Sequence, residues 1–140
     1  MRLENYGFRK AGRWKLKTGL ASGVTFELDD FENDRVVYSF VVGDVPKYIG
    51  ICEKDHTTLR DRMERYKYLK GGSKHSKKPS TNERIAKNIR QSLNSGEDVD
   101  IFALKPRKSR FRYKHKGLKI DLVKGLENPL IKELDPEWNE

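Results

Sequence analysis

Runs of apolar residues mark three stretches of the chain as buried β-strands. Residues 36–42 are nearly all apolar, which is typical of a strand that is covered on both faces. Residues 47–51 and 99–104 are shorter stretches rich in apolar residues, and they indicate a second and a third strand. We therefore expect three strands at the centre of the protein.

The first two of these strands are close enough in sequence to form a hairpin. Gly43 and Asp44 lie between them and are typical turn residues. A turn centred on Gly43 would pair Tyr38 directly with Tyr48 across the two antiparallel strands. The sequence thus predicts that two tyrosine side chains face each other.

Helical periodicity and capping residues predict three helices. The first begins after a threonine cap and covers about residues 58–69. The second begins at Ser80, which with Glu83 forms a capping box. The third covers about residues 120–134 and contains Pro129, where we expect a kink or a restart of the helix.

A β-hairpin is predicted near the N-terminus. Basic and apolar residues alternate over residues 13–17, and the alternation returns after a turn bounded by glycines. One face of this hairpin carries Lys15 and Lys17. Two interpretations stay open, an arm that contacts DNA and an edge hairpin that lysines keep soluble. We divide the chain into an N-terminal extension, residues 1–34, and a main domain, residues 35–140.

The composition of the chain indicates what kind of partner it binds. A chain of 140 residues favours a single compact domain, and its net charge of +9 with a pI of about 9.6 favours a polyanion as partner. Charged residues make up 36% of the chain. The alternative is a solvated basic surface without a nucleic-acid ligand.

The strongest concentration of basic charge is in residues 105–119. Eight lysines and arginines lie there without any acid, and Phe111 and Tyr113 alternate with them. The segment is either a solvated loop or an arm that grips phosphates, and the aromatic residues favour the arm. The basic residues that we expect to contact nucleic acid are Lys15, Lys17, Arg60, Lys77, Lys78, Arg84, Lys87, Arg107, Arg110, Arg112, Lys114 and Lys116.

Other classes of protein are disfavoured. Cys52 is the single cysteine, so no intramolecular disulfide can form, and no set of cysteine and histidine residues has the spacing of a zinc site. The first ten residues lack the apolar stretch of a signal peptide, and no run of about 18 apolar residues could span a membrane. We expect a reduced protein inside the cell, in the cytoplasm with its DNA, and no membrane contact.

Five side chains could together hydrolyse a phosphodiester. The reaction needs a positioned water, neutralised charge in the transition state and help for the leaving oxygen. Arginine can pair with phosphate oxygens, a carboxylate can hold Mg²⁺, and a tyrosine in a cationic environment can release part of its proton. Each residue type alone is also common in a core or on a surface, so only the combination indicates this chemistry. The candidates are Tyr38 and Tyr48 on neighbouring strands, Arg62 and Tyr66 on one helix face, and Glu127.

The order of these residues resembles a known superfamily. The segments are Val36-Val37-Tyr38, Tyr48-Ile49-Gly50, Leu59 to Tyr66, Leu126 to Ile131, and Pro136 to Asn139. Together they resemble the GIY-YIG nucleases, most closely the phage endonuclease II group and the related restriction-type enzymes. The resemblance implies an α+β fold with a small three-stranded antiparallel sheet flanked by helices, to which the N-terminal hairpin is added.

The resemblance also implies roles for individual residues. Tyr38 is similar to the tyrosine proposed as general base or water orienter, and Tyr48 is similar to its motif partner. Arg62 corresponds to the arginine that stabilises phosphate charge, and Tyr66 lies where relatives carry a residue near the attacking water. Gly50 lets the backbone approach closely.

Two further residues come from the C-terminal segment. The resemblance implies that Glu127 is the sole protein ligand of Mg²⁺ (or Mn²⁺) and that Asn139 closes the site. Val36 and Val37 depart from the glycine and isoleucine of the first motif. Because the loop over residues 51–58 is longer than in the phage group, Arg60 or Arg65 stays an alternative to Arg62.

The function that follows is a metal-dependent endonuclease that hydrolyses double-stranded DNA, with restriction-like site specificity as an open possibility. Since each chain offers one active site, cutting both strands suggests a homodimer or a higher homo-oligomer. The alternative is a non-catalytic nucleic-acid-binding module. A homing or repair nuclease with a separate DNA-binding domain is a weaker interpretation, because 140 residues show no second domain.

Overall fold

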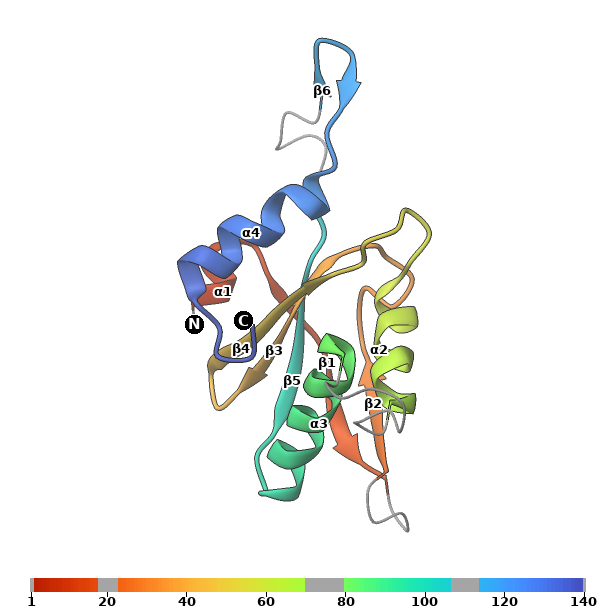
Figure 1. Cartoon of the computed structure of the whole chain (residues 1–140), viewed down its shortest axis with the longest axis vertical. Coiled ribbons are helices and arrows are strands. Elements are labelled where there is room, and N and C mark those ends of the chain that lie inside the picture. The colour runs from red at the N-terminus through yellow and green to blue at the C-terminus, as the bar shows by residue number, and fades with distance from the viewer. Residues whose placement is uncertain (1, 18–22, 70–79, 107–113, 140) are drawn as a thin grey trace.

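The computed structural model describes residues 2–17, 23–69, 80–106 and 114–139, which form a mixed α+β fold (Figure 1). Its centre is a five-stranded antiparallel sheet in the order β2-β1-β5-β3-β4. The strands are β1 (Arg9–Leu16), β2 (Val24–Leu28), β3 (Val37–Val42), β4 (Val45–Ile51), β5 (Val99–Leu104), and the two-residue strands β6 (Lys114–His115) and β7 (Leu118–Lys119). The helices are α1 (Arg2–Asn5), α2 (Leu59–Tyr68), α3 (Thr81–Asn94) and α4 (Leu122–Leu134).

The sheet has five strands, so the expectation of three was wrong. The predicted N-terminal hairpin exists as β1 and β2, and β1 pairs with β5 from Arg9↔Ala103 to Trp14↔Val99. Burial explains this pairing, because Trp14 is only 2% exposed and packs in the same core as the central strands. The hairpin is therefore part of the sheet, in which β2 is an edge strand and β1 lies between β2 and β5.

The predicted strands around Gly43 form β3 and β4, but their register differs from the expected one. Gly43 and Asp44 both adopt positive φ angles, 53° and 65°, and make a tight two-residue turn. A shift of register follows where Pro46, which has no N–H, lies opposite β3. As a result Tyr38 pairs with Gly50, and Tyr48 lies diagonally from Tyr38 on the same face, with ring centroids 6.3 Å apart.

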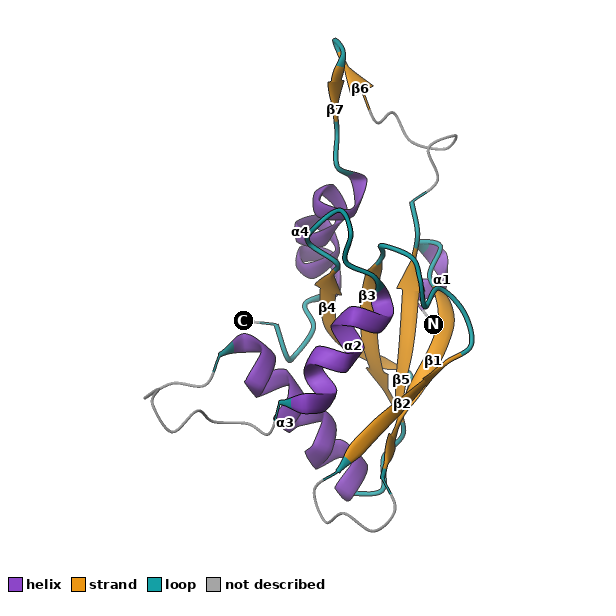
Figure 2. Ribbon diagram, turned by 90° about the vertical axis from the view of Figure 1, so that its right-hand side faces the viewer, coloured by secondary structure: helices purple, strands orange, loops and turns teal. Residues whose placement is uncertain are grey.

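Helices cover both faces of the central strands, which explains why every residue of β3 is buried (Figure 2). On one face, α2 and α3 pack together over a core that contains Tyr38, Tyr48 and Tyr66. On the other face, α4 packs on β3 and β4, and Leu3 of α1 joins that second core. Alternate residues of one strand thus enter two different cores.

The predicted helices are confirmed within about two residues at each end. Thr58 caps α2 through a capping box with Asp61, and the Ser80 side chain accepts a hydrogen bond from the Glu83 backbone. Pro129 lies inside α4, which continues through it. Within the part of the chain that the structure describes, no helix is both long and apolar enough to cross a bilayer.

The β6–β7 ribbon stands clear of the sheet, beyond the start of α4 (Figures 1 and 2). Lys116 and Gly117 form its turn with positive φ angles of 48° and 81°. Every residue from 114 to 120 is exposed. Residues 114–119 of the predicted basic arm therefore form a short hairpin, and the preceding residues 107–113 lie outside the described part of the chain.

Candidate active site

Three of the candidate side chains form one hydrogen-bonded cluster. The hydroxyl of Tyr38 on β3 lies 2.7 Å from the hydroxyl of Tyr66 on α2. Arg62, one turn before Tyr66, donates from Nε to the Tyr38 hydroxyl (3.2 Å) and from Nη2 to the Tyr66 hydroxyl (3.1 Å). The i to i+4 spacing along α2 therefore places one arginine and one tyrosine over the same strand.

Tyr38 has its position because residue 50 is a glycine. The ring of Tyr38 crosses the backbone of Gly50 on the neighbouring strand, and a Cβ added there would lie 2.6 Å from both Cζ and the hydroxyl oxygen of Tyr38. Only a residue without a side chain permits this approach. The close packing explains why the second motif ends in glycine.

We expect the Gly50→Ala variant to be destabilised by about 1–3 kcal/mol, since the ring of Tyr38 must move away from the added methyl group. Gly125→Ala is the matched control, because nothing lies within 4 Å of its added Cβ and alanine favours a helix. The control should be stabilised by about 0.5–1 kcal/mol. Urea denaturation measures both, and a Gly50→Ala protein as stable as wild type would contradict this packing.

Tyr48 is next to the cluster and nearer the surface. Its ring stacks on Phe40 at a centroid distance of 5.8 Å, and the side chain is 8% exposed, whereas Tyr38 is fully buried. Burial raises the pKa of Tyr48, and the neighbouring Tyr66 and the charge of Glu127 raise it further. Tyr48 is thus coupled electrostatically both to the buried cluster and to Glu127.

Burial opposes the release of a proton from these tyrosines, which the cationic environment was expected to favour. Arg62 does lower the pKa of Tyr38, but burial has the larger effect and raises that pKa well above its ordinary value. Burial likewise raises the pKa of Tyr66. At neutral pH these residues are neutral phenols that donate and accept hydrogen bonds.

Arg62 is the arginine that the fold places in the cluster. It is partly buried, its pKa is raised by interaction with the two tyrosines, and among the described residues all its hydrogen-bond acceptors are uncharged oxygens. Arg60 instead pairs with Glu32 at 2.6 Å, and Arg65 is exposed. The geometry therefore favours Arg62 over both alternatives, with a charge that no nearby carboxylate among the described residues neutralises.

Glu127 projects from α4, which packs on the edge strand β4. The side chain is partly buried, and burial together with the charge of Glu53 raises its pKa above the ordinary glutamate value. The charge of Glu127 also raises the pKa of Tyr48. The helix that carries Glu127 thus packs on β4, the strand that carries Tyr48.

A divalent cation fits this arrangement in one specific way. No group of three or more histidine, cysteine or acidic residues gathers within the described ranges, so an all-protein cage is absent there. Mg²⁺ needs no such cage, since it binds through one or two carboxylates together with water and substrate phosphates. Glu127, with Glu53 near enough to raise its pKa, provides a donor set of that kind.

Asn139 holds the C-terminal segment against β4. Its amide accepts from the backbone N–H of Ile49 (2.8 Å) and donates to the Ile49 carbonyl (2.9 Å), and the N–H of Trp138 donates to Lys47. Trp138 is buried in the tyrosine core. Asn139 therefore bonds to the backbone beside Tyr48, and its polar atoms are occupied there.

Two contacts near the site were missed from the sequence. Asn82, at the start of α3, accepts a hydrogen bond from Nη2 of Arg62 (3.1 Å). Arg35 forms a bidentate pair with Asp121, the cap of α4, with both distances 2.8 Å. Both contacts join segments that are far apart in sequence, so no local pattern indicates them.

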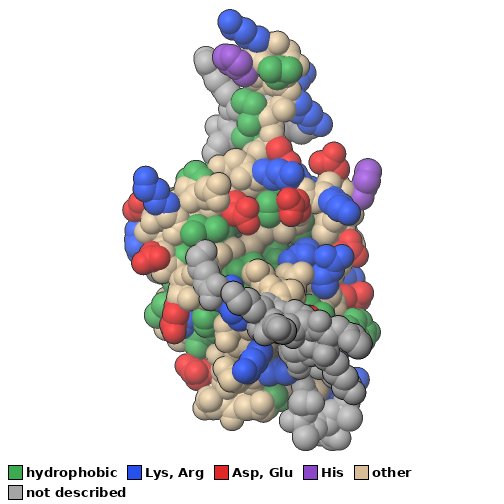
Figure 3. Space-filling view, viewed as in Figure 1, with side chains coloured by type: hydrophobic (Ala, Val, Ile, Leu, Met, Phe, Trp, Pro, Cys, Tyr) green, Lys and Arg blue, Asp and Glu red, His purple; other side chains and the backbone are tan. Residues whose placement is uncertain are grey.

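The predicted DNA-contacting residues fall into three groups. Lys15, Arg60 and Arg84 each have a partner within the protein, respectively Glu27, Glu32 and the Trp138 carbonyl. Lys17, Lys87, Lys114 and Lys116 are exposed, and basic side chains lie on the ribbon at the top of Figure 3 together with other side chains. The remaining five, Lys77, Lys78, Arg107, Arg110 and Arg112, lie outside the described residues.

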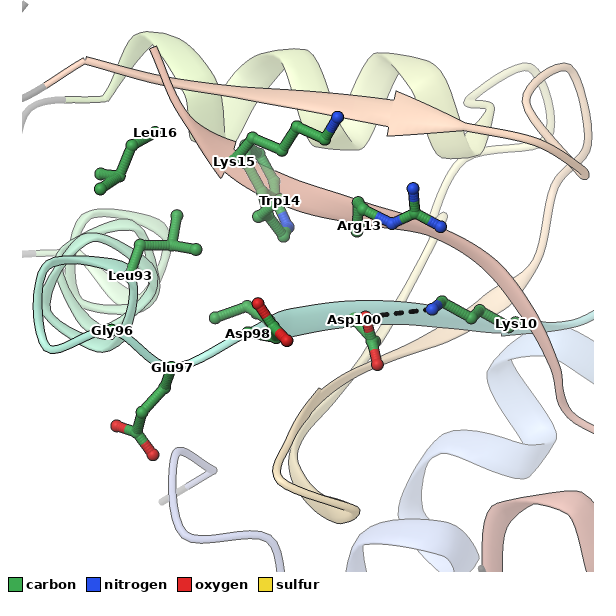
Figure 4. Close-up of a pocket in the computed structure, with 11 residues that line it drawn as sticks. Lys10, Arg13, Trp14, Lys15, Leu16, Leu93, Gly96, Glu97, Asp98 and Asp100 are labelled. Carbon is green, nitrogen blue, oxygen red and sulfur yellow. Dashed lines mark ion pairs between the residues drawn. The ribbon is translucent and has the colours of Figure 1, made fainter. Parts of the chain in front are cut away.

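A separate hollow of about 490 Å³ lies between β1 and the end of α3 (Figure 4). Trp14 and Leu93 line its apolar side, and Lys10 and Asp100 form an ion pair at 3.4 Å on its polar side. None of the six candidate catalytic residues lines it. The hollow is therefore distinct from the tyrosine and arginine cluster.

Comparison with known proteins identifies the fold. No family model matches the sequence, and no curated protein matches it. Among solved structures, a glutamate-to-alanine mutant of bacteriophage T4 endonuclease II is similar over 99% of this chain and 96% of its own, with a TM-score of 0.72 and 21% identity. The restriction endonuclease Hpy188I, solved in complex with product DNA, is similar over 99% of this chain and 80% of its own, with a TM-score of 0.57 and 18% identity. The chain therefore has the GIY-YIG-like nuclease fold that the motifs predict.

Proposed function

We propose that this protein is an endonuclease that hydrolyses phosphodiester bonds of double-stranded DNA with the help of Mg²⁺ or Mn²⁺. The observation that carries the proposal is the Arg62 guanidinium, held by Tyr38 and Tyr66 with no carboxylate partner among the described residues. A partly buried cation without a counter-ion is a site for an anion. A backbone phosphate is the anion that the basic surface would attract.

The structural neighbours support the same class of reaction. One is named as an endonuclease of bacteriophage T4, and the other is a restriction endonuclease that was solved with product DNA. The similarity covers 99% of this chain in both cases. DNA is thus the substrate class that we propose for this chain.

The residues at the rim of the cluster would contact the substrate. Arg62 would donate to a non-bridging phosphate oxygen and stabilise the charge that grows on it in the transition state. Tyr48, whose pKa the charge of Glu127 raises, would orient the attacking water as a neutral phenol. Tyr38 and Tyr66 are buried and would hold Arg62 from behind.

A carboxylate at position 127 would hold the metal ion. When bound, the ion supplies charge stabilisation to the phosphate and to the leaving oxygen. Asn139 would keep β4, and with it Tyr48, in place through its two bonds to Ile49.

Incubation of supercoiled plasmid with purified protein in Mg²⁺, Mn²⁺ or EDTA tests the proposal. Metal-dependent nicked or linear products are the expected result, and mapping of their ends reveals any sequence preference. Linear product at early times would support a homodimer or higher oligomer that cuts both strands. DNA binding without cleavage in either metal would overturn the nuclease proposal in favour of the binding module.

The β6–β7 ribbon is the part of the described surface that we propose as a DNA arm. Lys114 and Lys116 lie on a ribbon with no acidic residue and no core of its own. Two strands of two residues each are too short to be stable alone. A polyanion that neutralises these lysines would stabilise the ribbon on binding.

We expect the double variant Lys114→Gln, Lys116→Gln to bind all duplex sequences more weakly. The slope of log K against log salt should become shallower by about one for each phosphate that the ribbon no longer neutralises. Fluorescence anisotropy in EDTA at several salt concentrations measures both quantities without cleavage. Affinity and slope equal to wild type would remove the ribbon from the DNA interface.

A further inference from the structure

Asn82 touches the proposed phosphate-binding arginine from a third element. It lies in the first turn of α3, after the Ser80 cap, and its side-chain oxygen accepts from Nη2 of Arg62 at 3.1 Å. We propose that Asn82 is a positioning residue that aims the free edge of Arg62 at the scissile phosphate. This inference rests on the proposed nuclease function.

The donors of Arg62 show which edge of the guanidinium is free. A guanidinium has five N–H groups, one on Nε and two on each Nη nitrogen. Nε donates to Tyr38, and Nη2 donates to Tyr66 and to Asn82. Nothing in the described part of the chain accepts from Nη1, and we infer that its two N–H groups donate to a substrate oxygen. Asn82 accepts a hydrogen bond from the second N–H of Nη2 and thereby fixes the rotation of the guanidinium.

The three anchors come from three separate parts of the fold. Tyr38 is on β3, Tyr66 is on α2 and Asn82 is on α3. The tyrosines alone hold the inner edge of the guanidinium, while Asn82 restrains it from the side of the neighbouring helix. Without Asn82 the long arginine side chain could turn about its terminal bonds, at a cost in rate because reacting groups must be aligned.

The chemical nature of Asn82 is as important as its place. An amide oxygen accepts a hydrogen bond without neutralising the guanidinium charge. An aspartate at the same position would form an ion pair with Arg62 and compete with the phosphate for it. The two residues differ by one group, so the pair Asn82→Ala and Asn82→Asp separates the loss of an anchor from the loss of charge.

We expect Asn82→Ala to lower the single-turnover cleavage rate about tenfold, with the affinity for DNA within about twofold of wild type. We expect Asn82→Asp to lower the rate about 100-fold or more, since it removes the net charge of the site. The same variant should melt at or above the wild-type temperature, because an acid in the first turn of a helix is favourable and gains an ion pair. Asn94→Asp makes the same chemical change at the other end of α3 and should cut like wild type.

Coupling to Arg62 distinguishes positioning from a general structural role. In an Arg62→Ala background, Asn82→Ala should have no further effect on the residual rate, because the group that it aims is gone. A further tenfold loss in that background would overturn the inference. Equal cleavage by wild type, Asn82→Ala and Asn82→Asp would overturn it as well.

A measurement without catalysis keeps this inference separate from the nuclease proposal. The Nε–H signal of Arg62 in NMR spectra should shift and broaden in Asn82→Ala, and it should respond to a short DNA duplex in EDTA only in the wild-type protein. If wild type cuts no DNA in any metal, the nuclease proposal fails. The Arg62 signal then still tests whether Asn82 positions the guanidinium. An Arg62 signal unchanged by Asn82→Ala would then contradict the positioning role.

Discussion

Replacing Arg62 by alanine is expected to lower the rate of DNA cleavage by about 10³–10⁵-fold, the range known for arginines that stabilise phosphoryl transfer. Arg62 provides the one positive charge among the described residues that touches both buried tyrosines, and its Nη1 edge has no acceptor there. Removal of the guanidinium leaves the developing charge on the phosphate without its protein partner. Single-turnover kinetics at saturating protein measures this loss directly.

The folded state should survive that substitution. The hydroxyls of Tyr38 and Tyr66 stay bonded to each other at 2.7 Å, so no buried hydroxyl is left alone. We expect the free energy of unfolding to change by about 1 kcal/mol. Arg65→Ala is the matched control, since Arg65 is an exposed arginine on the same helix. Equal rates for the two variants, or a comparable loss in Arg65→Ala, would refute the assignment of Arg62.

The second large effect is expected from Glu127→Gln. The amide keeps the size of the side chain but removes the charge that holds a divalent ion, so metal-dependent cleavage should fall to the background level. DNA binding in EDTA should be retained. Because burial raises the pKa of Glu127, the native state without metal is disfavoured when this carboxyl ionises, and the variant should unfold at or above the wild-type midpoint at neutral pH.

The pH dependence follows from the same raised pKa. Metal binding requires the ionised carboxylate, so cleavage should decline as the pH falls through a pKa higher than that of an ordinary glutamate. The charge of Glu53 contributes to that elevation. Glu53→Gln should therefore move the acidic limb of the pH–rate profile to lower pH. A profile that stays in place, or that moves to higher pH, would show that the charge of Glu53 does not raise the pKa of Glu127.

Local sequence signals predicted much of the fold. The apolar run over residues 36–42, the turn at Gly43 and the caps at Thr58 and Ser80 each act over a few residues, and each element exists where it was expected. The number of strands was wrong because the pairing of β1 with β5 joins segments about 90 residues apart. Such pairing depends on burial of Trp14 in the common core.

The contact among three of the candidate side chains was predictable from the sequence, but the geometry around them was less so. Tyr38, Arg62 and Tyr66 do meet, as their order and spacing suggested. The register shift at Pro46 could not be read from turn residues alone, so Tyr38 lies over Gly50 and not opposite Tyr48. Burial, a property of the finished fold, also raises the pKa of Tyr38 above its ordinary value.

The most direct test of the account compares wild type, Arg62→Ala and Glu127→Gln on one end-labelled duplex. Each protein is used at saturating concentration, with cleavage followed in Mg²⁺ and a gel shift performed in EDTA on the same samples. We predict that all three proteins shift the duplex and that only wild type cuts it in Mg²⁺. Cleavage by either variant at the wild-type rate, or a wild-type protein that binds and never cuts in Mg²⁺ or Mn²⁺, would contradict the account.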